Sequence, residues 1–254
     1  METYLIYVLL FISAVVGGIL NAFAGGGGFI VFPSLILGGF STLKSNAIAC
    51  VALWTGNLVS ARTFKNDISI QKKDLVYLLS TTLAGAICGA ILMVLTDPQV
   101  FKSLVPYFHL ISWLMFCFSQ PLLRLMKKGR REHQHFQFSI GKLLPLFLVN
   151  LYGGYFSAGI GIMVLSLFSL FGMRNLNEMN GLKTVLVSVN NGIAAIIFIF
   201  SGFVELKVTL ILITGAMIGG YYGAKISRKL NQEVVRKAIM VIGGLIAIYF
   251  FFFI

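Results

Sequence analysis

Charged residues are scarce in this sequence: they make up 11% of its 254 residues, whereas 58% are hydrophobic. A soluble domain carries about 25% charged residues, so this chain lacks the polar surface that a water-soluble globule needs. The few charges also avoid long apolar stretches, such as 75–96 and 143–173. Because stretches of this length match the apolar core of a bilayer, the sequence predicts an all-α integral membrane protein.

Cysteine is rare as well, and its three copies, Cys50, Cys88 and Cys117, each stand alone inside an apolar stretch. Without paired spacing they exclude a disulfide framework and a zinc site. The nearest approach to a metal motif is the pair His133 and His135 in a basic loop. We interpret these two histidines as part of a solvated loop, so neither a metal nor another cofactor is expected.

Carboxylates are almost absent from the apolar stretches. Of the 8 Asp and Glu residues, none lies deep inside such a stretch, and Glu178 lies nearest, close to a boundary. His109 is the only histidine inside an apolar stretch, and no carboxylate accompanies it. Since an intramembrane enzyme needs a catalytic pair or a metal motif, no catalytic residue is predicted and the chain is not expected to be an enzyme.

Basic residues, in contrast, outnumber acidic ones by 20 to 8, which gives a net charge of +12. They lie in short loops, so they indicate orientation in a membrane and contact with anionic lipid rather than nucleic-acid binding. If the first apolar element of each half returns to the side from which it enters, all but Lys44, Lys102 and Lys207 share one side. This bias favours such a course over eight single crossings and places both termini outside the cytoplasm.

An internal repeat divides the chain. Sliding the sequence by 133 positions aligns 22–57 with 155–190 and superimposes several glycines and one asparagine of each half. Such duplication is a feature of many transporter folds. The predicted parts are a first membrane repeat over 1–126, a basic cytoplasmic loop over 127–138 and a second membrane repeat over 139–254.

Each half is predicted to hold four helical elements. The first, at 4–40 and at 139–173, is too long for one crossing and is broken by glycines. Ordinary spans follow at 44–63, 74–96 and 102–125, and at 179–202, 206–226 and 234–253. About eight transmembrane segments result, and the broken first element is either a re-entrant hairpin or two short crossings. Because each half then crosses an odd number of times, the two repeats are expected to be inverted.

The two glycine breaks are the main candidates for a binding site. The first contains Gly25, Gly26, Gly27 and Gly28, and the second contains Ser157, Gly159 and Gly161. Each glycine costs a helix about 1 kcal/mol relative to alanine, and irregular backbone inside a membrane is tolerated only against protein or water. Half-helices that begin at these breaks would aim free N–H groups and partial positive charge at an anion.

Close helix packing through small residues is the alternative interpretation of a glycine cluster. It is the role that we expect for the glycines outside the two breaks, Gly85, Gly89, Gly215, Gly219, Gly220 and Gly223. These six are therefore not included in the predicted binding site.

Polar side chains within apolar stretches complete the predicted substrate-binding site, because each needs a partner there. Asn21, Asn57 and Asn190 either line a solute cavity or bond between helices, and the repeat superimposes Asn57 on Asn190. Lys183 lies about one turn into a later span. Its ammonium group either snorkels to the cytoplasmic face or supplies a fixed positive charge for an anion.

Several motifs, in their order and duplication, resemble the sulfite exporter TauE/SafE family over nearly the whole chain. The motifs are Phe29–Pro33 after the first break, its echo at 152–166, the stretch 180–184 with Asn190 and 198–205 behind it, and the glycine-rich 215–224. The second half departs from the pattern because Ser166 stands where the first half has Pro33.

The resemblance implies a multi-pass permease of the bacterial inner membrane that moves small sulfur-containing or organic anions. We therefore predict transport of a small anion, such as sulfite or an organosulfonate, with membrane lipids as the other partner. Without an intramembrane carboxylate for ion coupling, the membrane potential favours anion efflux, by about 2.3 kcal/mol per charge per 100 mV. The alternatives are an anion channel and a non-transporting assembly component, and no oligomeric state is predicted.

Overall fold

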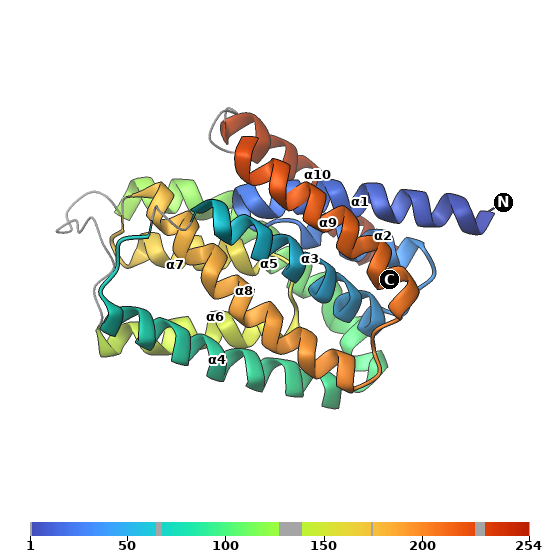
Figure 1. The fold of residues 1–254 in the computed structure, drawn as a ribbon, viewed down its shortest axis with the longest axis horizontal. Helices are drawn as coiled ribbons and strands as arrows, with labels where there is room; N and C mark the ends of the chain where they lie inside the picture. The colour runs from blue at the N-terminus through green and yellow to red at the C-terminus, as the bar shows by residue number, and fades with distance from the viewer. Residues whose placement is uncertain (1, 65–67, 127–138, 174, 227–231, 254) are drawn as a thin grey trace.

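The structure of this protein is a computed structural model that describes residues 2–64, 68–126, 139–173, 175–226 and 232–253 (Figure 1). These residues form helices and the turns between them, without a strand among them. The predicted basic loop over 127–138 lies outside the described residues. The all-helical prediction is therefore confirmed for the part of the chain that the structure describes.

The helices follow the predicted elements closely. In chain order they are α1 (Glu2–Ala24), α2 (Gly28–Leu37), α3 (Thr42–Phe64), α4 (Lys72–Leu95), α5 (Pro98–Met126), the short 3-10 helix η2 (Ile140–Lys142), α6 (Leu143–Tyr155), α7 (Ile160–Leu170), α8 (Leu176–Phe200), α9 (Leu206–Ile226) and α10 (Gln232–Phe253). The first element of each half is broken as predicted, into α1 and α2 and into α6 and α7.

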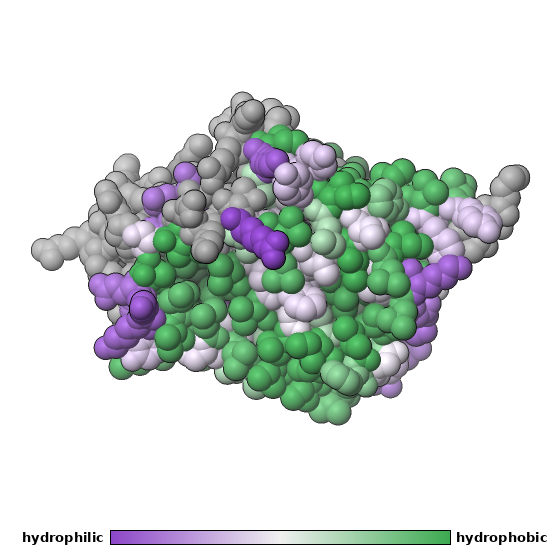
Figure 2. Space-filling view, viewed as in Figure 1, coloured by the Kyte–Doolittle hydropathy of each residue, from purple (hydrophilic) through white to green (hydrophobic). Residues whose placement is uncertain are grey.

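Four helices are long and apolar enough to cross a membrane among the described residues. These spans are Tyr4–Ala22, Lys72–Leu95, Asn177–Phe200 and Leu206–Ile226. Large hydrophobic side chains face outward from them and from their neighbours, for example Leu95 at 75% and Phe200 at 88% exposure. Figure 2 shows hydrophobic residues over the broad middle of the visible face. The chain is therefore a multi-pass membrane protein.

Each broken element is a hairpin whose outer ends meet. A Cβ atom on Gly38, just after α2, would lie 3.6 Å from Cγ2 of Ile6 near the start of α1. In the second half, Nζ of Lys142, just before α6, lies 5.3 Å from the ring centroid of Phe171, just after α7. The chain therefore enters and leaves each broken element at the same end of the molecule.

The two hairpins open toward opposite ends of the molecule. Lys207 at the start of α9 lies over the ring of Tyr7 near the start of α1, with 5.0 Å from Nζ to the ring centroid. At the other end, Lys142 before α6 lies near Asp74 in the first turn of α4. Burial lowers the pKa of Lys142, and the Asp74 carboxylate acts in the opposite direction. Figure 1 shows the same opposed entry of α1 and α6.

Helices from different halves pack through the glycines outside the breaks. A Cβ atom on Gly219 of α9 would overlap the carbonyl oxygen of Val15 in α1, and one on Gly89 of α4 would overlap that of Leu151 in α6. Backbones approach this closely only where side chains are small. The predicted packing role of these glycines is confirmed. The proposed repeats interlock, since the third element of each half packs on the first element of the other.

An aromatic cluster fills the core beside the second hairpin. The fully buried ring of Phe156 lies 5.2 Å from that of Phe32 and 5.7 Å from that of Phe108, measured between centroids. These three side chains come from α2, α5 and the break between α6 and α7. Aromatic pairs at such spacing stabilise a core beyond their buried area, so the cluster fastens both hairpins to α5.

Gly219→Ala is expected to destabilise the protein by about 1–3 kcal/mol, because one added carbon forces α9 away from α1. The measurement is the melting temperature in detergent by intrinsic fluorescence. Thr214→Ala, on the exposed face of the same helix, is the control and should leave the melting temperature within one degree or so of wild type. Equal melting temperatures for both variants would show that α1 and α9 are not tightly packed.

Candidate functional site

The first break is set by glycine conformation. Helix α1 ends at Ala24, Gly25 adopts φ +76°, and α2 begins at Gly28. A left-handed φ is open to glycine and rare for other residues, so Gly25 turns the chain back without strain. The amide of Gly25 still donates to the carbonyl of Asn21 at 2.9 Å, which closes the last turn of α1.

The second break repeats this construction in the other half. Helix α6 ends at Tyr155, Gly159 adopts φ +83°, and α7 begins at Ile160. Ser157 lies within the break and is buried. Both breaks therefore join a helix to a short half-helix of 10 or 11 residues, as the sequence predicts.

The two breaks lie against each other in the interior. A Cβ atom on Gly161 would lie 2.5 Å from the Cα atom of Gly25, and one on Gly28 would lie 2.6 Å from the Cα atom of Ala158. Real Cβ atoms do not approach backbone so closely, so both contacts require glycine. The structure thereby brings the predicted residues Gly25 and Gly161 into contact, although more than 130 positions separate them in the sequence.

The half-helices present their N-termini at this contact. In α2 the amides of Phe29 and Ile30 donate to the carbonyls of Gly26 and Gly27, and in α7 the amide of Ile162 donates to that of Gly159. The amides before these have no acceptor within their own helix. Each N-terminus carries roughly half a positive charge, so the meeting point of α2 and α7 is electropositive even before side chains are counted.

Lys183 brings a titratable amino group to the same place. Its side chain is 2% exposed, and its Nζ donates to the backbone carbonyl of Asn21 at 3.4 Å. Its Cδ atom lies 3.3 Å from the position that a Cβ atom on Gly161 would take. The snorkelling interpretation of Lys183 is therefore wrong, because the tail runs inward from α8 to the breaks instead of outward to a surface.

The three predicted asparagines are buried in two separate groups. Nδ2 of Asn21 donates to Oδ1 of Asn57 at 2.8 Å, which links the end of α1 to α3. Asn190 on α8 instead donates to the backbone carbonyl of Asn150 in α6 at 2.8 Å. Nδ2 of Asn57 and Oδ1 of Asn190 find no partner among the described residues. Asn21 thus contacts both Asn57 and Lys183, whereas Asn190 lies along α6.

Asn46 is a site residue that sequence reasoning missed. It is 1% exposed on α3 and holds the second break from both sides. Its Nδ2 donates to the carbonyl of Tyr155 at 2.9 Å, and its Oδ1 accepts from the amide of Ser157 at 3.3 Å. A signal was present, since Asn46 precedes Asn57 by 11 residues, or about three helical turns, and so shares its face.

Ser112 and Tyr152 form a second missed contact. Their hydroxyl groups are hydrogen-bonded to each other, and that of Tyr152 donates to the carbonyl of Ala158 at 2.8 Å. A Cβ atom on Gly159 would lie 2.8 Å from the Cβ atom of Ser112. Helix α5 therefore lies directly against the second break, which nothing in the local sequence of α5 indicates.

Replacing Asn46 with leucine is expected to lower the free energy of unfolding by about 1–3 kcal/mol, because it leaves a buried carbonyl and a buried amide without partners. The measurement is thermal unfolding in detergent. Asn177→Leu, at an exposed position of α8, is the control and should change stability by less than about 0.5 kcal/mol. Equal stability of both variants would contradict the bridging role of Asn46.

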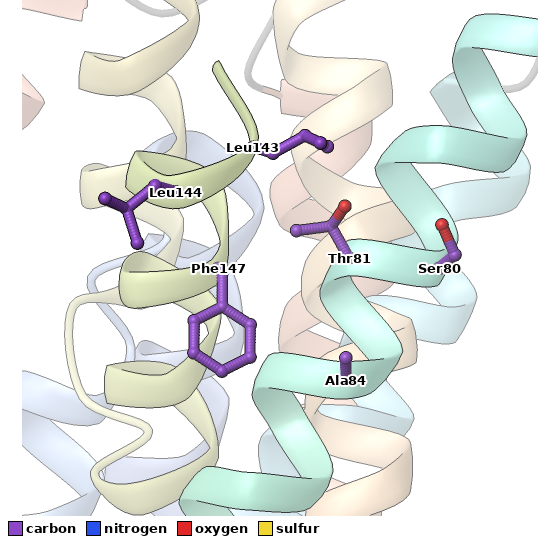
Figure 3. Close-up of a pocket in the computed structure, with 6 residues that line it drawn as sticks. All are labelled: Ser80, Thr81, Ala84, Leu143, Leu144 and Phe147. Carbon is purple, nitrogen blue, oxygen red and sulfur yellow. The ribbon is translucent and has the colours of Figure 1, made fainter. Parts of the chain in front are cut away.

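A separate hollow lies on the outer surface between α4 and α6 (Figure 3). Its volume is about 460 Å³, and its lining consists of Ser80, Thr81, Ala84, Leu143, Leu144 and Phe147. None of the predicted site residues reaches it, and Leu144 is 66% exposed there. We therefore place the candidate site at the meeting of the two breaks and not in this hollow.

Two broken hairpins whose electropositive ends meet beside a buried lysine define a helical membrane protein built like a transporter. The comparison with known families agrees: the family model described as sulfite exporter TauE/SafE matches residues 10–250. The chain belongs to the sulfite exporter TauE/SafE family, which confirms the resemblance seen in the sequence.

Curated relatives point to the same class of protein. A probable membrane transporter protein of Haemophilus influenzae is 26% identical over 234 residues, which cover 92% of this chain and 89% of the relative. The probable membrane transporter protein YfcA of Escherichia coli is 22% identical over 241 residues, with coverage of 94% and 87%. No solved structure matches the chain. Family and relatives together support a membrane transporter.

Proposed function

We propose that this protein is a permease that moves a small anion, such as sulfite, an organosulfonate or another small sulfur-containing or organic anion, across the bacterial inner membrane. The observation that carries the proposal is the meeting of two half-helix N-termini, α2 and α7, beside the buried Lys183. Exposed amides at helix N-termini bind anions. The substrate-binding residues are those of the two breaks with Asn21, Asn57 and Lys183, and Asn190 supports α6.

The charge on Lys183 supports an anionic solute. A buried ammonium group is costly unless it is paired. Among the described residues no carboxylate lies within salt-bridge distance of its Nζ, whereas Lys44 is paired with Glu205 at 2.6 Å. A bound anion would supply the missing negative charge, so binding the solute and neutralising Lys183 become the same event.

Inverted repeats account for the paired construction. The hairpins open toward opposite ends of the molecule, and the third element of each half packs on the first element of the other. Gly39 and Gly172, which the repeat superimposes, have φ values of +91° and +90°. We propose that the repeats are 1–126 and 139–254, and that each hairpin gates one side of the membrane.

Alternating access follows from the contact between the breaks. Gly25 and Gly161 touch, so in this conformation a solute cannot pass between them. We propose that solute passes when the hairpins separate, first from one side and then from the other. With the site positively charged and the cell interior negative, outward movement of the anion is the direction that the membrane potential favours.

The test combines binding and flux. Purified protein is first screened by thermal shift against sulfite, sulfate, thiosulfate, methanesulfonate and acetate. Any stabilising anion is then loaded, with a radioactive label, into proteoliposomes. A carrier gives saturable flux that unlabelled anion on the opposite side accelerates, whereas a channel gives current without counterflow. If none of these anions binds or is transported, an assembly role remains and the proposal is overturned.

A further inference from the structure

His109 is a buried titratable side chain that is not among the residues of the proposed anion site. It lies on α5 and is 0% exposed. Its ring is enclosed by two aromatic rings, with centroids 4.8 Å away at Phe29 of α2 and 5.1 Å away at Phe250 of α10. Both contacts are edge-on, with interplanar angles of 77° and 79°, so the imidazole is held in place by packing alone.

Neither ring nitrogen of His109 has a hydrogen-bond partner among the described residues. A neutral imidazole has one donor and one acceptor nitrogen. The large majority of buried side-chain polar atoms in proteins are hydrogen-bonded, so a histidine with both nitrogens unsatisfied calls for a ligand that can bond to them. The observation therefore points to a function rather than to core packing.

The position of His109 connects it to the two breaks. Phe29, which packs on the imidazole, is the second residue of α2, and its Cζ atom lies 3.2 Å from the position that a Cβ atom on Gly159 would take. Ser112, one turn after His109 on α5, touches Gly159 as well. The same face of α5 thus lies along the N-termini of both half-helices.

Few charged or titratable groups surround His109. Helices α2 and α7 contain none. On α3, which also packs on α5, Lys44 is paired with Glu205, Cys50 is buried and Arg62 is exposed. On α10 the titratable side chains that the structure describes are Lys237, which is exposed, and Tyr249. Lys183 of α8 is the charged group at the breaks themselves.

We propose that His109 takes up a proton when the anion binds, so that the permease carries anion and proton together. The inference rests on the proposed function. An imidazolium enclosed by aromatic rings is unfavourable when the site is empty, and a nearby negative charge stabilises it. Because coupling between two ligands is reciprocal, the proton that the anion stabilises in turn strengthens binding of the anion.

Charge balance then selects the class of solute. Lys183 alone neutralises one negative charge, whereas Lys183 with protonated His109 neutralises two. The coupled site therefore suits a doubly charged anion such as sulfite, sulfate or thiosulfate better than a singly charged one such as methanesulfonate. The proton comes from the water on the side from which the anion enters, and it leaves with the anion on the other side.

The first test is isothermal titration of thiosulfate, sulfite and sulfate in two buffers of different ionisation enthalpy, near pH 7. The difference in observed heat gives the number of protons taken up per anion. Wild type is expected to take up more protons than His109→Gln, by up to about one per anion. The comparison of the two proteins cancels any proton that the anion itself binds. Equal proton uptake by the two proteins would overturn the proposal.

The second test keeps His109 in place, in case His109→Gln does not fold. The chain has only 3 histidines, so the double variant His133→Gln and His135→Gln leaves His109 as the single histidine. Its labelled ring carbon Cε1 is followed by NMR from pH 5 to pH 9, with and without thiosulfate. The anion is expected to move the midpoint of protonation to higher pH. An unchanged midpoint with the anion bound would refute the proposal.

Failure of this inference is distinguishable from failure of the proposed function. Anion binding and flux without proton uptake leave the permease intact and remove only the coupling. If wild-type protein binds no anion, the proposed anion site is refuted, and the proposed coupling with it.

Discussion

Gly161→Ala is expected to slow movement of the anion by about tenfold. The added Cβ atom would lie 2.5 Å from the Cα atom of Gly25, and backbone cannot yield as a flexible side chain can. Overpacking of this kind costs about 1–3 kcal/mol, and about 1.4 kcal/mol corresponds to a tenfold change in an equilibrium constant. Since the contact lies between the two hairpins, the cost falls on the conformation in which they meet. The measurement is flux of labelled anion in proteoliposomes.

Gly141→Ala is the matched control, because a Cβ atom there meets nothing within 4 Å. It is expected to transport at the wild-type rate. The melting temperature of both variants in detergent separates loss of fold from loss of transport. If folded Gly161→Ala moves anion as fast as Gly141→Ala, contact between the breaks is not part of the transport cycle.

Lys183→Met is expected to weaken anion binding by roughly 100-fold, since loss of one member of a buried charge pair costs about 2–5 kcal/mol. The melting temperature without anion should stay the same or rise. The reason is that Lys183 is 2% exposed and its ammonium group bonds to one carbonyl among the described residues, so the group is costly to bury. Methionine fills similar space without that cost. The measurements are titration calorimetry of the anion and thermal unfolding.

Lys44→Met is the control for charge removal. Lys44 forms an ion pair with Glu205 in which both side chains are 43% exposed, and such pairs contribute about 0–1 kcal/mol. The anion affinity of Lys44→Met is expected to equal that of wild type. The opposite pattern for Lys183→Met, an unchanged affinity and a lower melting temperature, would assign Lys183 a structural role.

The helices were predictable because their signals are local. Apolar length and glycine content in one short window determine where a helix runs in a membrane and where it breaks, and α1–α2 and α6–α7 divide as expected. The packing glycines Gly89 and Gly219 were predictable for the same reason. The resemblance to the family also depended on motifs that are each contiguous in sequence.

Partners across the fold were not predictable. Asn46 and Ser157 are 111 positions apart and are joined by a hydrogen bond, and no periodicity of α3 indicates which break it would hold. His109 is one polar residue in an apolar helix, and only its packing against Phe29 and Phe250 reveals two unsatisfied nitrogens. Such contacts depend on how helices from both halves cross.

The sequence by itself determined a helical membrane protein with two glycine breaks, because hydrophobicity and glycine act through their immediate neighbours in the chain. The tertiary structure alone decided that Gly25 touches Gly161 and that the ammonium group of Lys183 turns inward to Asn21. Sequence allowed that lysine to reach either the surface or the breaks. The choice between them came from the packing of α8 against α3, α4, α6 and α7, which no single segment encodes.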